Sequence, residues 1–270
     1  MTDILHAFSL NPLFPAVISH AVEAPAVAAP TLSFLPFEPG LTTIGADGDE
    51  FYFDCEGPRH HSYVQPFALA NRPVSNREWL EFIHDGGYQT ATLWLSEGWH
   101  CAQQQQWLAP LYWHKNEGHW QQFGLSGLAD VDPDAPVCHI SYFEADAFAR
   151  WAGHRLATEQ EWEVVARDQP ISGNFLEQNY GCPVSTSEQG LLQLYGDVWE
   201  WTASPYMPYP GFKVAEGAIG EYNGKFMCGQ YVLRGGSCVT PKMQLRPTYR
   251  NFFYPHQRWQ FSGVRLAKDL

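Results

Sequence analysis

The sequence predicts an α+β fold that is rich in loops, with two or three helices and short strands. Three stretches carry a Ser or Thr three residues before a Glu, which is the pattern of a helix-capping box. Short β-like runs are separated by Gly and Asp turns, and Gly, Pro and aromatic residues are frequent beyond about residue 170. With 270 residues, 45% of them apolar and 17% charged, the chain can bury a core and is not disordered.

The first fifteen residues have a helical pattern. Ile4, Leu5 and Phe8 recur at a spacing of three to four residues, and Asn11-Pro12 stops the pattern. The segment is too short to be a domain. We interpret it as the end of a helix that begins upstream.

A linker and one domain are expected to follow. Residues 16–35 are rich in Ala and Pro and almost uncharged, which is typical of an extended linker. The division predicted is therefore 1–33 for the helix end and linker and 34–270 for the domain. The domain is expected to open with β-like runs at 42–46 and 51–56.

Three helices are predicted from their start and stop signals. Gly86-Gly87 is expected to end the first helix and Gly153 the second. The three capping boxes are Ser75 with Glu78, Ser141 with Glu144, and Thr158 with Glu161.

Charge and cysteine usage exclude several classes of function. The net charge is −13, without a basic run, so a nucleic acid partner is not expected. No stretch approaches the ~18–20 apolar residues of a membrane span, and the N-terminus has no basic signal-peptide region. The six cysteines are scattered without a Cys-x-x-Cys pair, so we expect free thiols and a cytoplasmic location.

The pattern predicts no metal site. None of the eleven histidines lies three or four residues from another, the spacing at which two imidazoles share a helix face. Cys238 follows Gly235-Gly236-Ser237 after a strand-like YVLR run. It is either an exposed thiol on a tight turn or a packed cysteine, and the usual burial of free cysteines favours the second.

The C-terminal third combines arginines with aromatic rings. Residues 245–259 interleave Arg246, Arg250 and Arg258 with five aromatic side chains. Such a mixture suits a small ligand with a carboxylate or a quaternary ammonium group. It equally suits an aromatic core with salt-bridged arginines, and both interpretations stay open.

Longer motifs point to a known family. They are PVSNREWLEFIHDGGY, VCHISYFEADAFARWAGHRLATEQEWEVVAR, LYGDVWEWT, YVLRGGSCVTP, and RPTYRNFF followed by FSGVRLA. In this order the chain resembles the formylglycine-generating-enzyme-like (sulfatase-modifying-factor) superfamily over about residues 35–270. The resemblance implies a C-type-lectin-like fold with small antiparallel sheets. EYNGKFMCGQYVLRGGSC and TYRNFFYPHQRWQFSGVRLA are most similar to ergothioneine sulfoxide synthases.

The resemblance also implies where the metal of that branch is held. Its members bind iron(II) through a His-x-x-x-His-Gln-Glu helix and one further histidine of a DinB-like domain. The opening TDILHAFSLNPLFPA is similar to the segment after that helix, so residues 1–33 are interpreted as its end plus the linker. Iron(II) is then expected for the complete enzyme, with a DinB-like partner domain or chain, and not for this chain alone. Structural calcium is possible in the fold.

Substrate-binding positions follow residue by residue. In actinobacterial members hercynine (trimethylhistidine) lies near an Asn-Trp-Asp triplet, which matches Asn251, Phe252 and Phe253. Gln257 stands where an Arg is found. Phe253 and Gln257 replace charged residues linked to γ-glutamylcysteine binding, so cysteine is the expected thiol.

Two further positions complete the expected substrate-binding set, Arg258 and Tyr222. The catalytic residue stays unknown, because the catalytic tyrosine of actinobacterial members would fall near Ile219.

The leading hypothesis is the substrate-binding portion of an iron(II)- and O₂-dependent sulfoxide synthase. It would join cysteine sulfur to C2 of the hercynine imidazole and oxidise that sulfur. One alternative is a non-catalytic, lectin-like binding module. A third is a formylglycine-generating-type oxidase, whose relatives bind copper through two C-terminal cysteines, whereas no cysteine follows Cys238 here.

Overall fold

The computed structural model describes residues 1–19, 22–48 and 50–270. The α-helices are α1 (Thr2–Ser9), α2 (Asn76–His84), α3 (Ser96–Gln104), α4 (Tyr142–Trp151), α5 (Glu159–Ala166) and α6 (Asn223–Phe226). The strands are β1 (Phe34–Phe37), β2 (Gly40–Ile44), β3 (His60–Val64), β4 (Phe67–Ala70), β5 (Trp113–Asn116), β6 (His119–Gly124), β7 (Gly127–Asp130), β8 (Arg155–Leu156), β9 (Trp199–Pro205), β10 (Tyr231–Arg234), β11 (Asn251–Phe253), β12 (Ser262–Gly263) and β13 (Leu266–Asp269).

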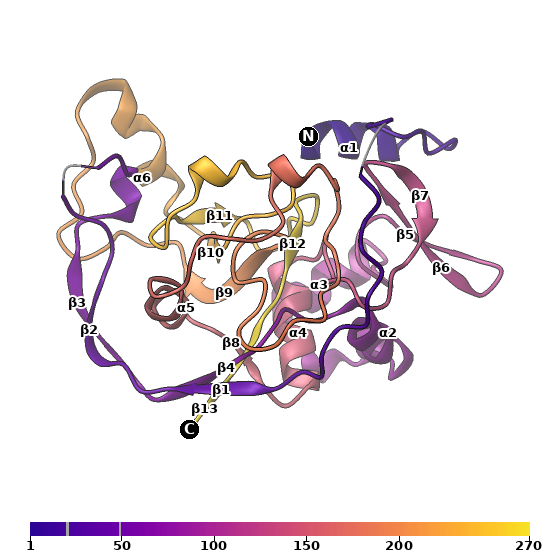
Figure 1. Cartoon of the computed structure of the whole chain (residues 1–270), viewed down its shortest axis with the longest axis horizontal. Coiled ribbons are helices and arrows are strands. Elements are labelled where there is room, and N and C mark those ends of the chain that lie inside the picture. Colours follow the sequence, from indigo (N-terminus) through magenta and orange to yellow (C-terminus); the bar gives the residue numbers. More distant parts are fainter. Residues whose placement is uncertain (20–21, 49) are drawn as a thin grey trace.

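Small sheets joined by long loops make up the architecture. One four-stranded sheet has the order β1-β4-β13-β8, and the other has the order β11-β10-β9-β12. All neighbours are antiparallel except β12 and β9. The β2–β3 hairpin lies with α6 at one side of the molecule, and α1 lies above the β5–β6–β7 sheet at the other (Figure 1). The predicted α+β class with small antiparallel sheets is confirmed.

Helices α2, α4 and α5 begin at the predicted capping residues. In each box the Ser or Thr side chain accepts a hydrogen bond from the Glu backbone N–H, and the Glu carboxylate accepts one from the N-cap backbone. The outer oxygen of each carboxylate also meets an arginine, and the pairs are Arg72 with Glu78, Arg258 with Glu144, and Arg155 with Glu161. Each box therefore fixes a helix start and also holds another part of the chain against it.

Residues 51–56 do not form the expected strand and instead end in a 3₁₀ turn at Asp54–Glu56. The Glu56 carboxylate accepts from the Phe53 N–H at 3.0 Å and from Thr248 Oγ1 at 2.7 Å, and it also pairs with Arg246. These distant contacts override the alternating pattern. Helix α3 was not predicted, because it starts after Leu95 without a side-chain cap.

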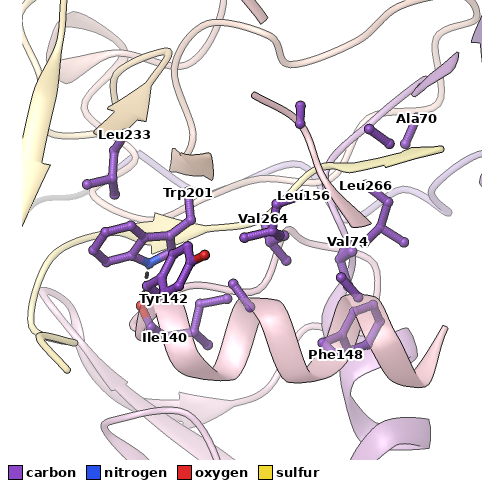
Figure 2. Close-up of a cluster of buried hydrophobic side chains, with 14 of the residues drawn as sticks. Ala70, Val74, Ile140, Tyr142, Phe148, Leu156, Trp201, Leu233, Val264 and Leu266 are labelled. Carbon is purple, nitrogen blue, oxygen red and sulfur yellow. Dashed lines mark hydrogen bonds between the residues drawn. The ribbon is translucent and has the colours of Figure 1, made fainter. Parts of the chain in front are cut away.

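The main core lies between α4 and the two four-stranded sheets. Figure 2 shows Phe148 of α4 near Val74, and Trp201 of β9 above the start of the same helix. Trp201 is buried, and its Nε1 donates to the carbonyl oxygen of Ile140 at 3.0 Å. A buried indole with a satisfied N–H combines apolar burial with a fixed orientation.

Residues 22–33 pack along the body of the domain without helix or strand. The Val27 N–H donates to Ser185 Oγ at 3.1 Å, and the Ala29 N–H donates to Asp134 Oδ1 at 3.2 Å. The segment with linker composition is thus hydrogen-bonded to the domain surface. In the described residues no helix is long and apolar enough to cross a membrane.

A second apolar cluster lies beneath α1. Leu5 of α1 is buried in it, together with Tyr112 and Phe261. His139 lies between these two rings, with centroid distances of 4.8 Å to Tyr112 and 4.5 Å to Phe261. Burial lowers the pKa of His139 to about 3, so the imidazole is neutral in the folded protein.

This neutral histidine predicts a loss of stability in acid. An unfolded histidine binds a proton below about pH 6.5, whereas folded His139 does so only near pH 3. The contribution of His139 is therefore fully present above about pH 6.5 and falls as the pH drops through this window, by up to ~1.4 kcal/mol per pH unit.

His139→Asn tests this, because Asn tolerates the backbone φ of 62° at this position. The free energy of unfolding in urea, measured between pH 7 and pH 4, should depend less steeply on pH than in the wild type. The exposed His119→Asn variant is the control and should keep the wild-type slope. Equal slopes for all three proteins would show that His139 is not held neutral.

Candidate functional site

A cavity of about 420 Å³ opens beside strand β11, at the edge of its sheet. Its walls come from three parts of the chain, namely the 3₁₀ turn after Phe53, the segment around α6, and residues 249–259. The lining residues are Phe53, Cys55, Tyr222, Asn223, Phe226, Gln230, Tyr249, Arg250, Asn251, Phe252, Phe253, Tyr254, Gln257 and Trp259.

Phe252 is the centre of an aromatic wall. Its ring stacks on that of Tyr206 at 4.1 Å between centroids and 9° between planes. The Tyr222 and Phe226 rings lie 6.3 Å and 5.9 Å from it. Tyr206 is buried behind the wall, whereas Tyr222 is 62% exposed. Because the faces of aromatic rings attract cations, such a wall suits an alkylated ammonium group.

Asn251 and Phe253 flank Phe252 and, by the alternation of a strand, project to the other side. Phe253 meets Trp259 edge to face at 5.4 Å. Gln257 lines the cavity next to them, and its Oε1 accepts from the Tyr254 N–H at 2.9 Å. This hydrogen bond closes the turn that leads to Trp259.

Asn251 offers a polar group to the cavity. Its Oδ1 accepts a hydrogen bond from the Phe252 N–H at 2.9 Å, which fixes the side-chain amide. Within residues 1–19, 22–48 and 50–270 the Nδ2 group has no hydrogen-bond partner, although the side chain is only partly exposed. Asn251 can therefore donate to a carboxylate or to a ring nitrogen of a bound ligand.

Arg250 forms the floor of the cavity and is not available to a ligand. Its Nε and Nη2 donate to Glu159 at 2.9 Å, and its Nη1 donates to the carbonyl oxygen of Cys55 at 2.9 Å. Arg234 shares Glu159 and also pairs with Glu163 at 3.0 Å. The two guanidinium groups and two carboxylates balance each other inside the protein.

The structure separates Arg258 from the other predicted site residues. Its guanidinium pairs with Glu144 at 2.7 Å, also donates to the Ala109 carbonyl oxygen, and lies over the Trp107 ring at 4.3 Å. It does not line the cavity. Gln257 and Trp259, the neighbours of Arg258 in the chain, both line the cavity. Arg258 therefore anchors their turn to Glu144 on the side that faces away from the cavity. Arg258 thus points away from the cavity that the other predicted residues line.

The C-terminal third combines paired arginines with a cavity lined by aromatic rings. The three arginines of residues 245–259 are paired with carboxylates, as an aromatic core with salt bridges requires. The aromatic rings nevertheless line a cavity. The site is thus formed by rings and neutral amides without a free guanidinium.

The structure brings five predicted residues together, and they are Asn251, Phe252, Phe253, Gln257 and Tyr222. Sequence reasoning missed Phe226 and Asn223, which follow Tyr222 on the same turn of chain, and also Trp259. The run from Tyr222 to Phe226 carried the signal, because its two rings are four residues apart and meet at 5.2 Å. The side chain of Ile219 lies outside the described part of the structure.

Cys55, in the cavity wall, and Cys238, after the glycine turn, are both buried. Cys55 lines the cavity, and burial raises its pKa. Burial likewise raises the pKa of Cys238, which confirms the packed cysteine expected after the glycine turn. Both thiols are therefore protonated at neutral pH and are poor nucleophiles and metal ligands.

His20 lies outside the described residues, which hold the other ten histidines. In that part of the chain no group of three or more His, Cys, Asp or Glu residues is arranged to hold a metal ion. The lining of the cavity contains aromatic and amide side chains, one arginine and one cysteine, and no His or carboxylate. These donors do not fit an iron(II) site.

The family model of the sulfatase-modifying factor enzyme 1-like domain matches residues 21–183 and 177–270. The hercynine oxygenase of Mycobacterium tuberculosis is 37% identical, and the match covers 84% of this chain and 58% of that protein. The hercynine oxygenase of Mycolicibacterium smegmatis is 35% identical, with 99% and 68% covered. The chain thus spans roughly three fifths of the length of these relatives.

Solved structures agree on the fold. PvdO from Pseudomonas aeruginosa superimposes with a TM-score of 0.59 at 18% identity, over 91% of this chain and 100% of that one. At this identity the likeness concerns the fold alone.

The buried charges under the cavity predict a large effect of Glu159→Gln. Removing this negative charge leaves Arg234 and Arg250 under-compensated, and breaking a buried pair costs about 3–5 kcal/mol. Urea unfolding at pH 7, followed by tryptophan fluorescence, measures the loss. Asp146→Asn is the control, because Asp146 pairs with the half-exposed Arg150 and should cost at most ~1 kcal/mol. Equal costs would contradict a structural role for the cluster.

Proposed function

The chain belongs to the family of sulfatase-modifying factor enzyme 1-like domains, and from this premise we propose that it is the substrate-binding portion of an iron(II)- and O₂-dependent hercynine sulfoxide synthase. The observation that carries the proposal is the cavity beside β11, where aromatic faces and the Asn251 amide line one space. The similarity to hercynine oxygenases supports the choice of substrate.

Hercynine has three groups that the cavity must accommodate, namely a trimethylammonium, a carboxylate and an imidazole. Phe252 and Tyr222 offer ring faces for the trimethylammonium, which has no N–H and cannot be hydrogen-bonded. Asn251 Nδ2 can donate to the carboxylate or to an imidazole nitrogen. Since Arg250 is fully paired with Glu159, the cavity offers no unpaired positive charge that would repel the ammonium group.

For the second substrate we propose free cysteine. Phe253 and Gln257 lie in the cavity wall where charged residues serve γ-glutamylcysteine in other branches of the family. A neutral amide and an apolar ring packed on Trp259 give little compensation for an additional carboxylate. A smaller thiol with fewer charges therefore suits this wall better.

The reaction combines hercynine, cysteine and O₂. The imidazole C2–H and the thiol S–H bonds are broken, a C–S bond forms, one oxygen atom becomes the sulfoxide, and the other leaves as water. Iron(II) would supply O₂ activation. Because the donors described here do not fit it, we assign it to a DinB-like domain or chain and derive no step through it. The role of this chain is to orient hercynine, which lowers the barrier by positioning.

A cytoplasmic location is part of the proposal. Every cysteine of the chain is described and unpaired in the structure, as is usual in a reducing compartment. Hercynine and cysteine are both small hydrophilic molecules, and the cytoplasm supplies the thiol in reduced form.

The proposal predicts which substitutions weaken hercynine binding. Asn251→Ala should raise the Kd of hercynine about tenfold, because one hydrogen bond of ~1–1.5 kcal/mol is lost. Phe252→Leu should mainly reduce the preference for hercynine over histidine, which lacks the trimethylammonium. Calorimetric titration of the purified chain measures both values, and the titration is repeated with the iron-binding domain present.

Asn116→Ala is the matched control, because Asn116 is exposed on the remote β5–β6 hairpin. It should bind hercynine like the wild type. If Asn251→Ala leaves the affinity unchanged in both forms of the protein, the assignment of this cavity to hercynine is wrong.

A further inference from the structure

A long excursion of the chain, residues 207–229, carries one wall of the cavity. It connects β9 to β10 and projects from the side of the molecule near the β2–β3 hairpin, with α6 beside the 3₁₀ turn at Asp54–Glu56 (Figure 1). Tyr222 and Phe226 belong to it, whereas Phe252 belongs to the sheet. The aromatic wall is therefore divided between a projecting segment and the rigid frame.

At the base of this excursion Tyr209 is buried in the Glu159 cluster, and Asn223 fastens the outer part to the domain. Asn223 Nδ2 donates to Asp54 Oδ1 at 2.5 Å, which joins α6 to the 3₁₀ turn. Tyr206 adds a longer hydrogen bond from its hydroxyl to Asn223 Oδ1, at 3.4 Å. Asn223 is buried at 6% exposure, although Tyr222 beside it is largely exposed. A buried amide in a projecting loop is costly unless it is hydrogen-bonded, so this contact defines the position of α6.

Among the described residues, the side chain of Asp54 makes no other hydrogen bond. Its second carboxylate oxygen is buried and has no hydrogen-bond partner among the described residues, and the ion pairs there do not include it. A structural aspartate would normally satisfy both oxygens. The carboxylate of Asp54 is instead oriented so that one oxygen accepts from Asn223.

Beyond these contacts the excursion has little regular structure. Gly211 and Gly229 stand near its two ends with φ angles of 84° and 68°, a region in which glycine is the least restricted residue. Between them only the five-residue 3₁₀ stretch at Gly217–Glu221 and the four-residue α6 are regular. Short helices of this kind are not stable without tertiary contacts.

We propose that Asp54 is a positioning residue that, through Asn223, latches the 207–229 excursion over the cavity, so that Tyr222 and Phe226 enclose a quaternary ammonium group against Phe252. The inference rests on the proposed function only for the identity of the ligand. A hydrogen bond to a carboxylate is stronger than one between neutral groups, and such a bond can decide between two conformations of a loop.

Limited trypsinolysis of the purified chain tests the latch. Lys213 and Lys225 are the lysines of the excursion, which contains no arginine, and both are exposed or partly exposed. Lys115 on the β5–β6 hairpin, at the opposite side of Figure 1, serves as the internal control. Cleavage rates at the three bonds are followed by mass spectrometry.

A set of exchanged side chains separates positioning from folding. Asn223→Asp places a carboxylate against Asp54, and the repulsion should raise cleavage at Lys213 and Lys225 about tenfold, the effect of losing ~1.4 kcal/mol. Asp54→Asn keeps an acceptor but loses the charge, so its cleavage rates should lie between those of the wild type and Asn223→Asp. The double exchange Asp54→Asn with Asn223→Asp restores the hydrogen bond with donor and acceptor reversed, so it should rescue the wild-type rate. Cleavage at Lys115 should not change in any of them.

Tetramethylammonium and hercynine are the ligand probes. Both should protect Lys213 and Lys225 in the wild type and in the double exchange, and less in Asn223→Asp. If Asn223→Asp is cleaved like the wild type, or the double exchange is not rescued, the latch is wrong whatever the ligands do. If the exchanges behave as expected and tetramethylammonium protects but hercynine does not, the latch holds and the proposed substrate fails.

Discussion

The structure depends on a pair of buried arginines that share two buried glutamates. Arg234 of β10 and Arg250, directly before β11, both bind Glu159, and Arg234 also binds Glu163 one helical turn later. The hydroxyl of Tyr209 completes the cluster. Two positive and two negative charges balance there, and hydrogen bonds satisfy most of their polar atoms, which is the condition for burying charge at tolerable cost. The cluster fixes helix α5 against the sheet whose edge forms the cavity.

This constraint explains the chemistry of the cavity. Arg250 ties the β11 edge to α5 and also to the carbonyl of Cys55, so it sets the distance between two walls. Because the guanidinium of Arg250 donates to groups within the protein, aromatic rings and side-chain amides are left to face a ligand. A cavity with an unpaired guanidinium would favour anions, whereas a lining of rings and amides suits the diffuse positive charge of the proposed ligand. The proposed selectivity thus follows from how the core neutralises its own charges.

How far the sequence predicted the structure depends on whether the signal was local. The capping boxes at Ser75, Ser141 and Thr158 are contained within four residues, so three helix starts were predicted correctly. Residues 51–56 alternate like a strand, but Arg246, almost two hundred residues away, binds Glu56 and makes the segment turn. No local pattern carries that information.

The site shows the same division. Asn251, Phe252 and Phe253 form an edge strand that lines the cavity, and their proximity follows directly from their order in the sequence. Arg258 follows Gln257 directly, yet it points away to Glu144, since in a turn one residue of displacement reverses the direction of a side chain. Phe226 reaches the site only because the 207–229 excursion folds back to Asp54. The rigid half of the aromatic wall could therefore be predicted from sequence and the projecting half could not. The projecting half depends on the hydrogen bond between Asn223 and Asp54, which lie 169 residues apart in the sequence, so no local pattern carries its position.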